Sequence, residues 1–196
     1  MTKQTTPIPD LIADIGGTNA RFALALPDGR IEAERILSGA DYPDLMQAAG
    51  AYLSGVSGPR PRRAAVAVAT AISGDWIQFT NSPWSFSTEA ARRALGLDRL
   101  LILNDFTALA LALPRLGADE RRAVGGGTAI AHAPIALIGA GTGLGVSGLV
   151  WSGQNWLALE TEGGHVTFAA ADQREWAVSR ILQQRFGHVS PERLLS

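Results

Sequence analysis

The chain has 196 residues, enough for one domain of ordinary size or two small ones. Hydrophobic residues make up 46% and charged residues 18%, which predicts a buried core and excludes a disordered chain. The net charge of −1 argues against a nucleic-acid partner, and the lack of cysteine excludes disulfides and thiolate metal sites. The apolar runs are too short to span a membrane and residues 1–10 lack an apolar signal core, so we expect a cytoplasmic protein with no membrane partner.

Apolar runs bounded by turn residues predict a first half that alternates strands and helices. The predicted strands cover residues 11–15, 20–26, 31–37, 64–69, 75–80 and 100–103. A helix over 42–53 is expected to begin at the N-cap Asp41, with Pro43 in its first turn. A second helix over 88–95 follows the N-cap Ser87 and ends before Gly96. A third, over 105–113, is apolar and stops at Pro114.

A segment rich in charge and glycine, residues 116–127, separates this half from a second three-strand opening. Strands are predicted over 134–140, 144–151 and 155–159, and a helix over 172–186. The repeated opening predicts an α/β fold of two related lobes around a cleft. We expect a small N-terminal lobe over residues 1–115 and the first part of a larger lobe over 116–196, the second lobe being incomplete.

Two glycine turns begin these two halves. The first glycine turn (Gly16-Gly17-Thr18-Asn19) follows the strand that carries Asp14, and the second glycine turn (Gly141-Thr142-Gly143) lies between residues 134–140 and 144–151. Glycine permits positive φ and close approach of another molecule to the backbone, and successive N–H groups in such turns suit anionic oxygens. Facing each other, the turns would form a two-sided phosphate clamp. The alternative is a pair of ordinary hairpins.

Other classes of nucleotide site and enzyme do not fit the sequence. Lys3 is the only lysine, so neither a P-loop nor the strand lysine of a protein kinase is present, and phosphate contacts are expected from backbone amides and a metal. The glycine string 139–145 is followed by a predicted strand and not a helix, which argues against a dinucleotide site. The three histidines lack metalloprotease spacing, and no Gly-x-Ser-x-Gly elbow occurs.

Three polar groups are candidates for chemistry, and each has a plainer reading. Asn104-Asp105 follows a predicted buried strand, a common site position in α/β sheets, although both residues also favour helix N-caps. The cluster Glu162-Gly-Gly-His165 places a carboxylate and an imidazole around a bend, where both could face a polyhydroxylated ligand or simply form a polar turn. His188 and Glu192 form a third group that alone reads as surface.

Taken together, these motifs closely resemble those of bacterial glucokinases of the proteobacterial type, within the actin–hexokinase superfamily. The resemblance runs from residue 11 to residue 196. The matching strings are Ala13-Asp-Ile-Gly-Gly-Thr-Asn-Ala-Arg21, Ser73-Gly-Asp-Trp76, Thr80-Asn81, Leu103-Asn-Asp-Phe-Thr-Ala108, Gly139-Ala-Gly-Thr-Gly-Leu-Gly-Val146, Glu162-Gly-Gly-His165 and Gly187-His-Val-Ser-x-Glu-Arg193. One local departure is Leu159-Glu-Thr161, where Pro-Gly would be expected before the cluster Glu162-Gly-Gly-His165.

The resemblance implies a ribonuclease-H-like fold of the actin and hexokinase type and assigns roles to the candidate residues. Asp105 would be the catalytic base for the sugar's 6-hydroxyl. The other sugar hydroxyls would be held by Asn104, Glu162, His165 and Glu192. Asp14 would orient Mg²⁺ through water, and the ATP phosphates would be lined by Gly16, Gly17, Thr18, Asn19, Gly141, Thr142 and Gly143.

The implied function is an ATP-dependent glucokinase, which transfers the γ-phosphate to glucose in the first step of glycolysis. Its expected partners are glucose, ATP and Mg²⁺. The resemblance also implies a longer chain, because members of the family continue with a segment that contacts the adenosine of ATP. A non-catalytic sugar-binding fragment or module is therefore the alternative, and exposed apolar faces would favour a homo-oligomer. A sugar-responsive repressor is disfavoured, because no helix-turn-helix or basic patch precedes residue 11.

Overall fold

The computed structural model describes residues 7–141 and 143–195. They form two compact units, the first ending at Asp105 and the second beginning at Phe106. The units divide at the start of helix α3 (Asp105–Ala112), before the lobe boundary expected between residues 115 and 116. That lobe boundary stays a prediction.

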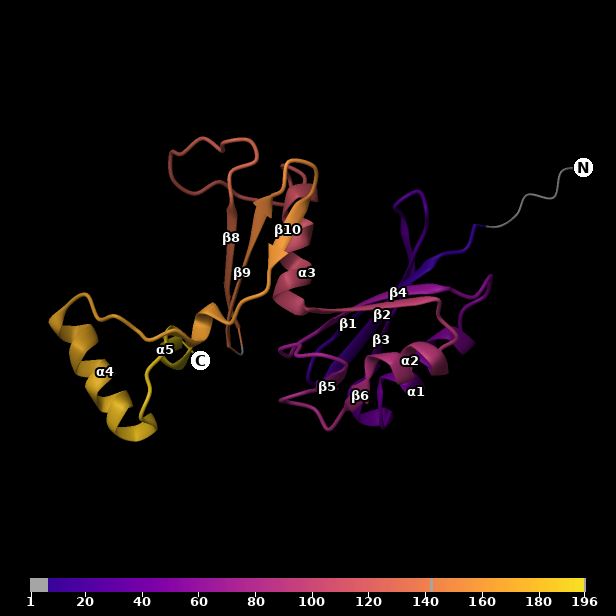
Figure 1. Ribbon diagram of the computed structural model, residues 1–196, viewed down its shortest axis with the longest axis horizontal. Coiled ribbons are helices and arrows are strands. Elements are labelled where there is room, and N and C mark those ends of the chain that lie inside the picture. Colours follow the sequence, from indigo (N-terminus) through magenta and orange to yellow (C-terminus); the bar gives the residue numbers. More distant parts are fainter. Residues whose placement is uncertain (1–6, 142, 196) are drawn as a thin grey trace, which may run out of the picture. The chain divides into compact units, whose positions relative to one another are not determined.

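The first unit is built on a mixed five-stranded sheet with the strand order β3-β2-β1-β4-β7 (Figure 1). The first three strands form an antiparallel meander, while β1, β4 and β7 run parallel to one another. The strands are β1 (Asp10–Ile15), β2 (Asn19–Ala25), β3 (Ile31–Ser38), β4 (Arg63–Val68) and β7 (Arg99–Asn104). The five strands of this sheet were all predicted, with ends that differ from the observed ones by at most one residue.

The core of the first unit lies between this sheet and the helices α1 (Leu45–Ser54) and α2 (Thr88–Ala94), which cover the same face (Figure 1). In β4 buried and less buried residues alternate, as expected for a strand with one face on a core. Phe22 of β2 stacks on Tyr52 of α1, with ring centroids 5.3 Å apart. A short hairpin of β5 (Trp76–Gln78) and β6 (Ser85–Ser87) completes the unit, and β6 was missed because three residues give no readable period.

The helix predicted from residue 42 begins later, at Leu45, and its N-cap is Asp44 and not Asp41. Tyr42 precedes Pro43 and is extended, with φ −133° and ψ 139°, because the proline ring disfavours helical backbone at the residue before it. The Asp44 carboxylate then accepts a hydrogen bond of 2.8 Å from the backbone N–H of Gln47. Asp41 instead ends a single 3₁₀ turn, Gly39–Asp41. The predicted cap Ser87 is confirmed, since its hydroxyl accepts from the N–H of Ala90 at 3.1 Å.

This correction gives a matched pair of variants. Asp44→Ala is expected to lower the free energy of unfolding by about 1 kcal/mol, because it removes the acceptor for an N–H of the first helical turn. Asp41→Ala, the same substitution in the preceding turn, is expected to change it by less than about 0.5 kcal/mol. Urea unfolding followed by tryptophan fluorescence measures both values. Equal losses for the two variants would contradict the assignment of the cap.

The second unit contains the three-stranded antiparallel sheet β10-β9-β8, drawn in orange in Figure 1. Its strands are β8 (Ile135–Ala140), β9 (Leu144–Trp151) and β10 (Trp156–Leu159). The predicted long helix is α4 (Gln173–Phe186), capped by Asp172 and followed by Gly187 in the left-handed region at φ +78°. A short helix, α5 (Pro191–Leu195), follows it and was not predicted.

The two units differ in how much apolar surface they bury. The main cluster of buried side chains lies entirely in the first unit. In the second unit, helix α4 leaves Trp176 and Ile181 about three-fifths exposed (60% and 65%), and Ile138 of β8 is 68% exposed. Among the described residues, no helix combines the length and the apolar character needed to cross a membrane.

Candidate functional site

The candidate site residues of the first unit gather at one edge of its sheet. In the parallel ladders Ile15 pairs with Val68, and Val68 pairs with Asn104, so β1, β4 and β7 reach their carboxyl ends in a single row. The first glycine turn follows β1 at this edge, and Asp105 follows β7. Crevices outside the carboxyl ends of such strands are where α/β sheets bind ligands.

Asn104 ties the end of β7 to the loop after β4. Its side-chain amide donates a hydrogen bond to the backbone carbonyl of Thr70 at 3.3 Å. The next residue, Asp105, is the first residue of helix α3, so the helix leaves the sheet at the position of the candidate base. The order strand, Asn-Asp, apolar helix that the sequence predicts is thus confirmed, while the chemical roles of the two side chains stay predictions.

The first glycine turn is closed by its own backbone. The N–H of Gly16 donates to the carbonyl of Asn19 at 2.9 Å, and Thr18 accepts from the N–H of Gly39 at 2.7 Å. Gly17 abuts Asn81, because an added Cβ would stand 3.0 Å from the Asn81 carbonyl oxygen. Glycine permits positive φ, but none of the described glycines of the two turns adopts it. At Gly17 the glycine is required by close packing and not by backbone conformation.

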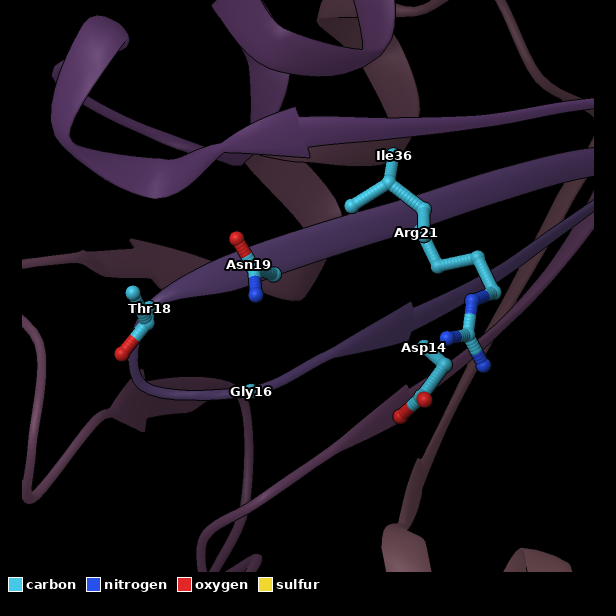
Figure 2. A pocket seen from close by; sticks show the side chains of 6 residues that line it. All are labelled: Asp14, Gly16, Thr18, Asn19, Arg21 and Ile36. Atoms are coloured by element: carbon cyan, nitrogen blue, oxygen red, sulfur yellow. The ribbon is translucent and has the colours of Figure 1, made fainter.

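A pocket of about 290 Å³ opens beside this turn (Figure 2). Four of the predicted residues line it, and two further residues that were not predicted line it as well. The lining residues are Asp14, Gly16, Thr18, Asn19, Arg21 and Ile36. Because Asp14 and Arg21 are paired across β1 and β2, both side chains extend from the same face of the hairpin, as Figure 2 shows.

Arg21 adds a guanidinium to the pocket that holds the predicted residues. Its guanidinium lines the pocket, where its Nε lies 3.3 Å from a carboxylate oxygen of Glu34. Strand alternation across the turn is the sequence signal that places Arg21 beside Asp14. A carboxylate, a guanidinium, a hydroxyl and an amide around one pocket suit an anionic ligand together with a hydrated cation.

The second glycine turn connects β8 to β9. The N–H of Gly141 donates to the carbonyl of Gly143 at 2.8 Å, and a Cβ at Gly141 would meet no described atom within 4 Å, so its backbone is open to close approach. Thr142, predicted to line the phosphates, lies outside the described residues. At Gly141 the turn therefore offers an accessible backbone, as a phosphate-binding turn requires.

Phe106, the residue after Asp105, lies against the glycine hairpin. Gly139 and Gly145 face each other across β8 and β9, and a Cβ on either would come within 3 Å of the Phe106 ring: 2.9 Å from Gly139 and 2.1 Å from Gly145. The two glycines thus make room for one aromatic ring. This explains the otherwise surplus glycines of the string 139–145, which the sequence alone did not assign to packing.

In the second unit the carboxylates of two candidate sugar-binding residues, Glu162 and Glu192, lie near the imidazole of the third, His165. His165 Nε2 lies 3.8 Å from Glu162 Oε2 and 3.6 Å from Glu192 Oε1, so one nitrogen faces two carboxylates. Glu162 precedes the 3₁₀ turn Gly163–His165 and His165 is its last residue, while Glu192 comes from α5. Residues from separate parts of the sequence therefore form one polar cluster, which we call the carboxylate–imidazole cluster.

Glycine is required where this cluster meets the sheet. A Cβ at Gly164 would stand 2.0 Å from the carbonyl oxygen of Leu144, and one at Gly163 would stand 2.8 Å from the side chain of Val146. The bend therefore packs directly on the start of β9. Thr161, part of the departure from the expected family pattern, donates from its hydroxyl to the Val146 carbonyl at 2.6 Å and fastens the same loop.

The candidate metal and phosphate residues fit a cation that binds together with the substrate's phosphates better than one held by protein side chains alone. Among the residues that the structure describes, no group of three or more histidine or carboxylate side chains could hold a metal ion. A single carboxylate, Asp14, faces the pocket beside polar groups. Mg²⁺ keeps several waters and is typically held by one or two carboxylates and the phosphates of its substrate, so this donor set fits it.

The amino-acid sequence matches a known protein family. The glucokinase family model matches residues 11–196. A glucokinase of Chromobacterium violaceum is 55% identical over 96% of this chain and 54% of its own length, and one of Ralstonia nicotianae is 48% identical over 97% of this chain and 57% of its own. The chain thus spans about half the length of these curated relatives.

Solved structures agree. The crystal structure of a glucokinase from an Antarctic psychrotroph superposes with a TM-score of 0.84 and 36% identity, over 96% of this chain and 60% of that one. A glucokinase from Balamuthia mandrillaris, solved in complex with glucose, superposes with a TM-score of 0.71 at 18% identity, over 97% of this chain and 60% of that one, which shows a shared fold. The chain belongs to the glucokinase family.

Proposed function

We propose that this chain carries the hexose-binding residues and the phosphate-binding turns of a kinase that transfers the γ-phosphate of ATP to the 6-hydroxyl of glucose. The observation that carries the proposal is the common row of strand ends in the first unit. It brings the first glycine turn and the Asn104-Asp105 pair to the same sheet edge. A phosphate-binding turn and a carboxylate base at the same edge of one sheet are the minimum that in-line phosphoryl transfer to a hydroxyl needs.

The strand order of the first unit supports a ribonuclease-H-like fold of the actin and hexokinase type. An antiparallel meander β3-β2-β1 extended by the parallel strands β4 and β7 gives one mixed sheet, and the loops after β1 and β7 carry the candidate residues. The second glycine turn connects the first two strands of a second sheet, β8 and β9. We propose that the complete protein closes these two parts around its substrates, which would expel water that otherwise hydrolyses ATP.

Asp105 is proposed as the general base. In phosphoryl transfer the protein chiefly positions groups and neutralises charge, and the base accepts the proton of the attacking hydroxyl. Asp14 would hold Mg²⁺ through water, and the ion would supply charge neutralisation at the phosphates. Backbone N–H groups of Gly16, Gly17 and the second glycine turn, with the hydroxyl of Thr18 and the amide of Asn19, would orient the phosphate oxygens.

The carboxylate–imidazole cluster and Asn104 are proposed to hold the remaining sugar hydroxyls. A hydroxyl both donates and accepts, so carboxylates can accept its proton while an amide or imidazole donates to its oxygen. Sites built this way reject analogues that lack a hydroxyl much more strongly than apolar pockets reject size variants. A ROK family glucokinase of Streptomyces griseus has been crystallised with glucose and AMPPNP, and its fold resemblance makes these two ligands the first to test.

The rival function is that of a sugar-binding module, which would bind sugar without phosphoryl transfer. The chain spans about half the length of the curated relatives that it matches. Glucose and ATP titrations by calorimetry, together with a coupled kinase assay, separate the two functions. Glucose binding with turnover supports the kinase, glucose binding without turnover supports a sugar-binding module, and failure to bind glucose contradicts both.

A ligand control makes that test specific. 6-Deoxyglucose lacks only the hydroxyl that receives the phosphate, so it is expected to give no product and to bind more weakly than glucose, because Asp105 is left without its hydrogen-bond partner. Binding with the full affinity of glucose would contradict the assignment of Asp105 to the 6-position. The cytoplasmic location and the homo-oligomeric state stay predictions.

A further inference from the structure

One residue of the second unit, Leu144, is held from two sides, by Glu192 of the carboxylate–imidazole cluster and by the 3₁₀ turn Gly163–His165. Its backbone N–H donates to Glu192 Oε2 at 2.9 Å. Its carbonyl oxygen lies against Gly164, where an added Cβ would stand only 2.0 Å away. Leu144 is the first residue of β9 and directly follows the second glycine turn. Glu192 and the Gly163–His165 turn therefore set the position at which the second glycine turn joins β9.

Glu192 touches both the turn and the cluster through one carboxylate. While Oε2 accepts the Leu144 N–H, Oε1 lies 3.6 Å from His165 Nε2, and Oε2 also lies beside Gly143, where a Cβ would come within 2.5 Å of it. The carboxylate is planar and rigid, so any rotation that improves a contact at one oxygen displaces the other. A hydrogen bond from a backbone N–H to a carboxylate is also roughly twice as strong as a neutral one.

The two glutamates of the cluster differ in burial. The Glu192 side chain is 26% exposed, whereas the side chains of Glu162 and His165 are both 58% exposed. Both glutamates face the same imidazole nitrogen, but the described bond from a glutamate to the start of β9 belongs to Glu192. Glu162 is therefore placed to meet a ligand alone, while Glu192 is placed to meet a ligand and the turn together.

We propose that Glu192 is a positioning residue that couples occupancy of the hexose cluster to the position of Gly143 and Leu144, where the second glycine turn joins β9. The inference rests on the proposed function, because it takes the ligand of the cluster to be a hexose. A sugar hydroxyl that donates to Oε1 fixes the carboxylate plane, and Oε2 then fixes the Leu144 N–H and the turn before it. By linkage, a phosphate ligand bound at the turn raises the affinity for the hexose by the same factor that the hexose raises affinity at the turn.

The test follows the Leu144 amide by NMR in the 196-residue chain labelled with ¹⁵N-leucine, its signal being assigned by loss in Leu144→Ile. Glucose is expected to shift this amide to saturation. In Glu192→Gln the oxygen that accepts the N–H is kept but the charge is lost, and we expect the shift at saturating glucose to fall at least about fivefold. Glu162→Gln is the matched control: more glucose is needed, but the full shift is reached.

Calorimetric titrations of glucose with and without Mg²⁺–ADP supply the second readout. The parent and Glu162→Gln are expected to show the same coupling factor, about fivefold or more, while the factor falls to about one in Glu192→Gln. A purely structural hydrogen bond would leave the coupling factor unchanged in all three proteins. Equal coupling in the parent and Glu192→Gln, or a Leu144 amide that stays still while other leucine amides titrate with glucose, overturns the inference alone. If no amide responds to glucose, the proposed function fails and the inference fails with it.

Discussion

Replacing Asp105 by Asn in the catalytically competent protein is expected to lower kcat by about 10²–10⁴-fold. The amide keeps nearly the size of the carboxylate and can still hydrogen-bond the 6-hydroxyl, but it cannot accept its proton. The dissociation constant for glucose is therefore expected to stay within a few-fold of the parent. A coupled assay gives kcat, and calorimetry gives the affinity for glucose.

The opposite end of the same strand provides the control for this variant. Asp98 directly precedes β7 and pairs with Arg62 at 2.7 Å, whereas Asp105 directly follows it. Asp98→Asn makes the same chemical change at the far edge of the sheet, and we expect kcat to remain within about twofold of the parent. If Asp105→Asn also keeps kcat within a few-fold of the parent, the role of Asp105 as general base is wrong.

Most strands of both units were predictable because their signals are local. In the second unit, for example, the strand over 144–151 was predicted to the residue, since glycine turns bound its apolar run. The start of α1 was missed by three residues, because Asp41 and Asp44 are both good N-caps and only the backbone restriction at Tyr42-Pro43 decides between them. Local pattern was thus sufficient for the existence of elements and insufficient for one of their ends.

The candidate site was less accessible to sequence reasoning from residues alone. Asn104-Asp105 could be placed at a strand end from local pattern, but the meeting of Glu192 with His165 joins elements that no periodicity connects. The resemblance supplied that set, and the structure brings its members together. Packing was the hardest part to predict: Gly145, which the sequence analysis considered only as part of a glycine string, accommodates a phenylalanine ring.

The substitution Gly164→Ala is expected to destabilise the second unit strongly, because the added methyl group would collide with backbone. Its Cβ would stand 2.0 Å from the Leu144 carbonyl oxygen and 3.1 Å from the carbonyl carbon, and a backbone group paired into a sheet cannot rotate away. We expect a loss of about 3 kcal/mol in the free energy of unfolding, the upper part of the range for overpacking. Urea unfolding followed by the fluorescence of Trp151 and Trp156, both in the second unit, measures it.

Substitutions at two other glycines provide a comparison for this loss of stability, because the added methyl group would meet different surroundings at each. Gly145→Ala would place its Cβ 2.1 Å from the Phe106 ring, but a side chain can move where a backbone cannot, so a smaller loss of about 1–2 kcal/mol is expected. Gly126→Ala would meet no described atom within 4 Å, and its change should stay within about 0.5 kcal/mol. Any other order among the three variants would contradict the close packing of the Gly163–His165 turn on β9. That packing is also what gives the hexose cluster a rigid base, so Gly164→Ala should weaken glucose binding under conditions in which the chain remains folded.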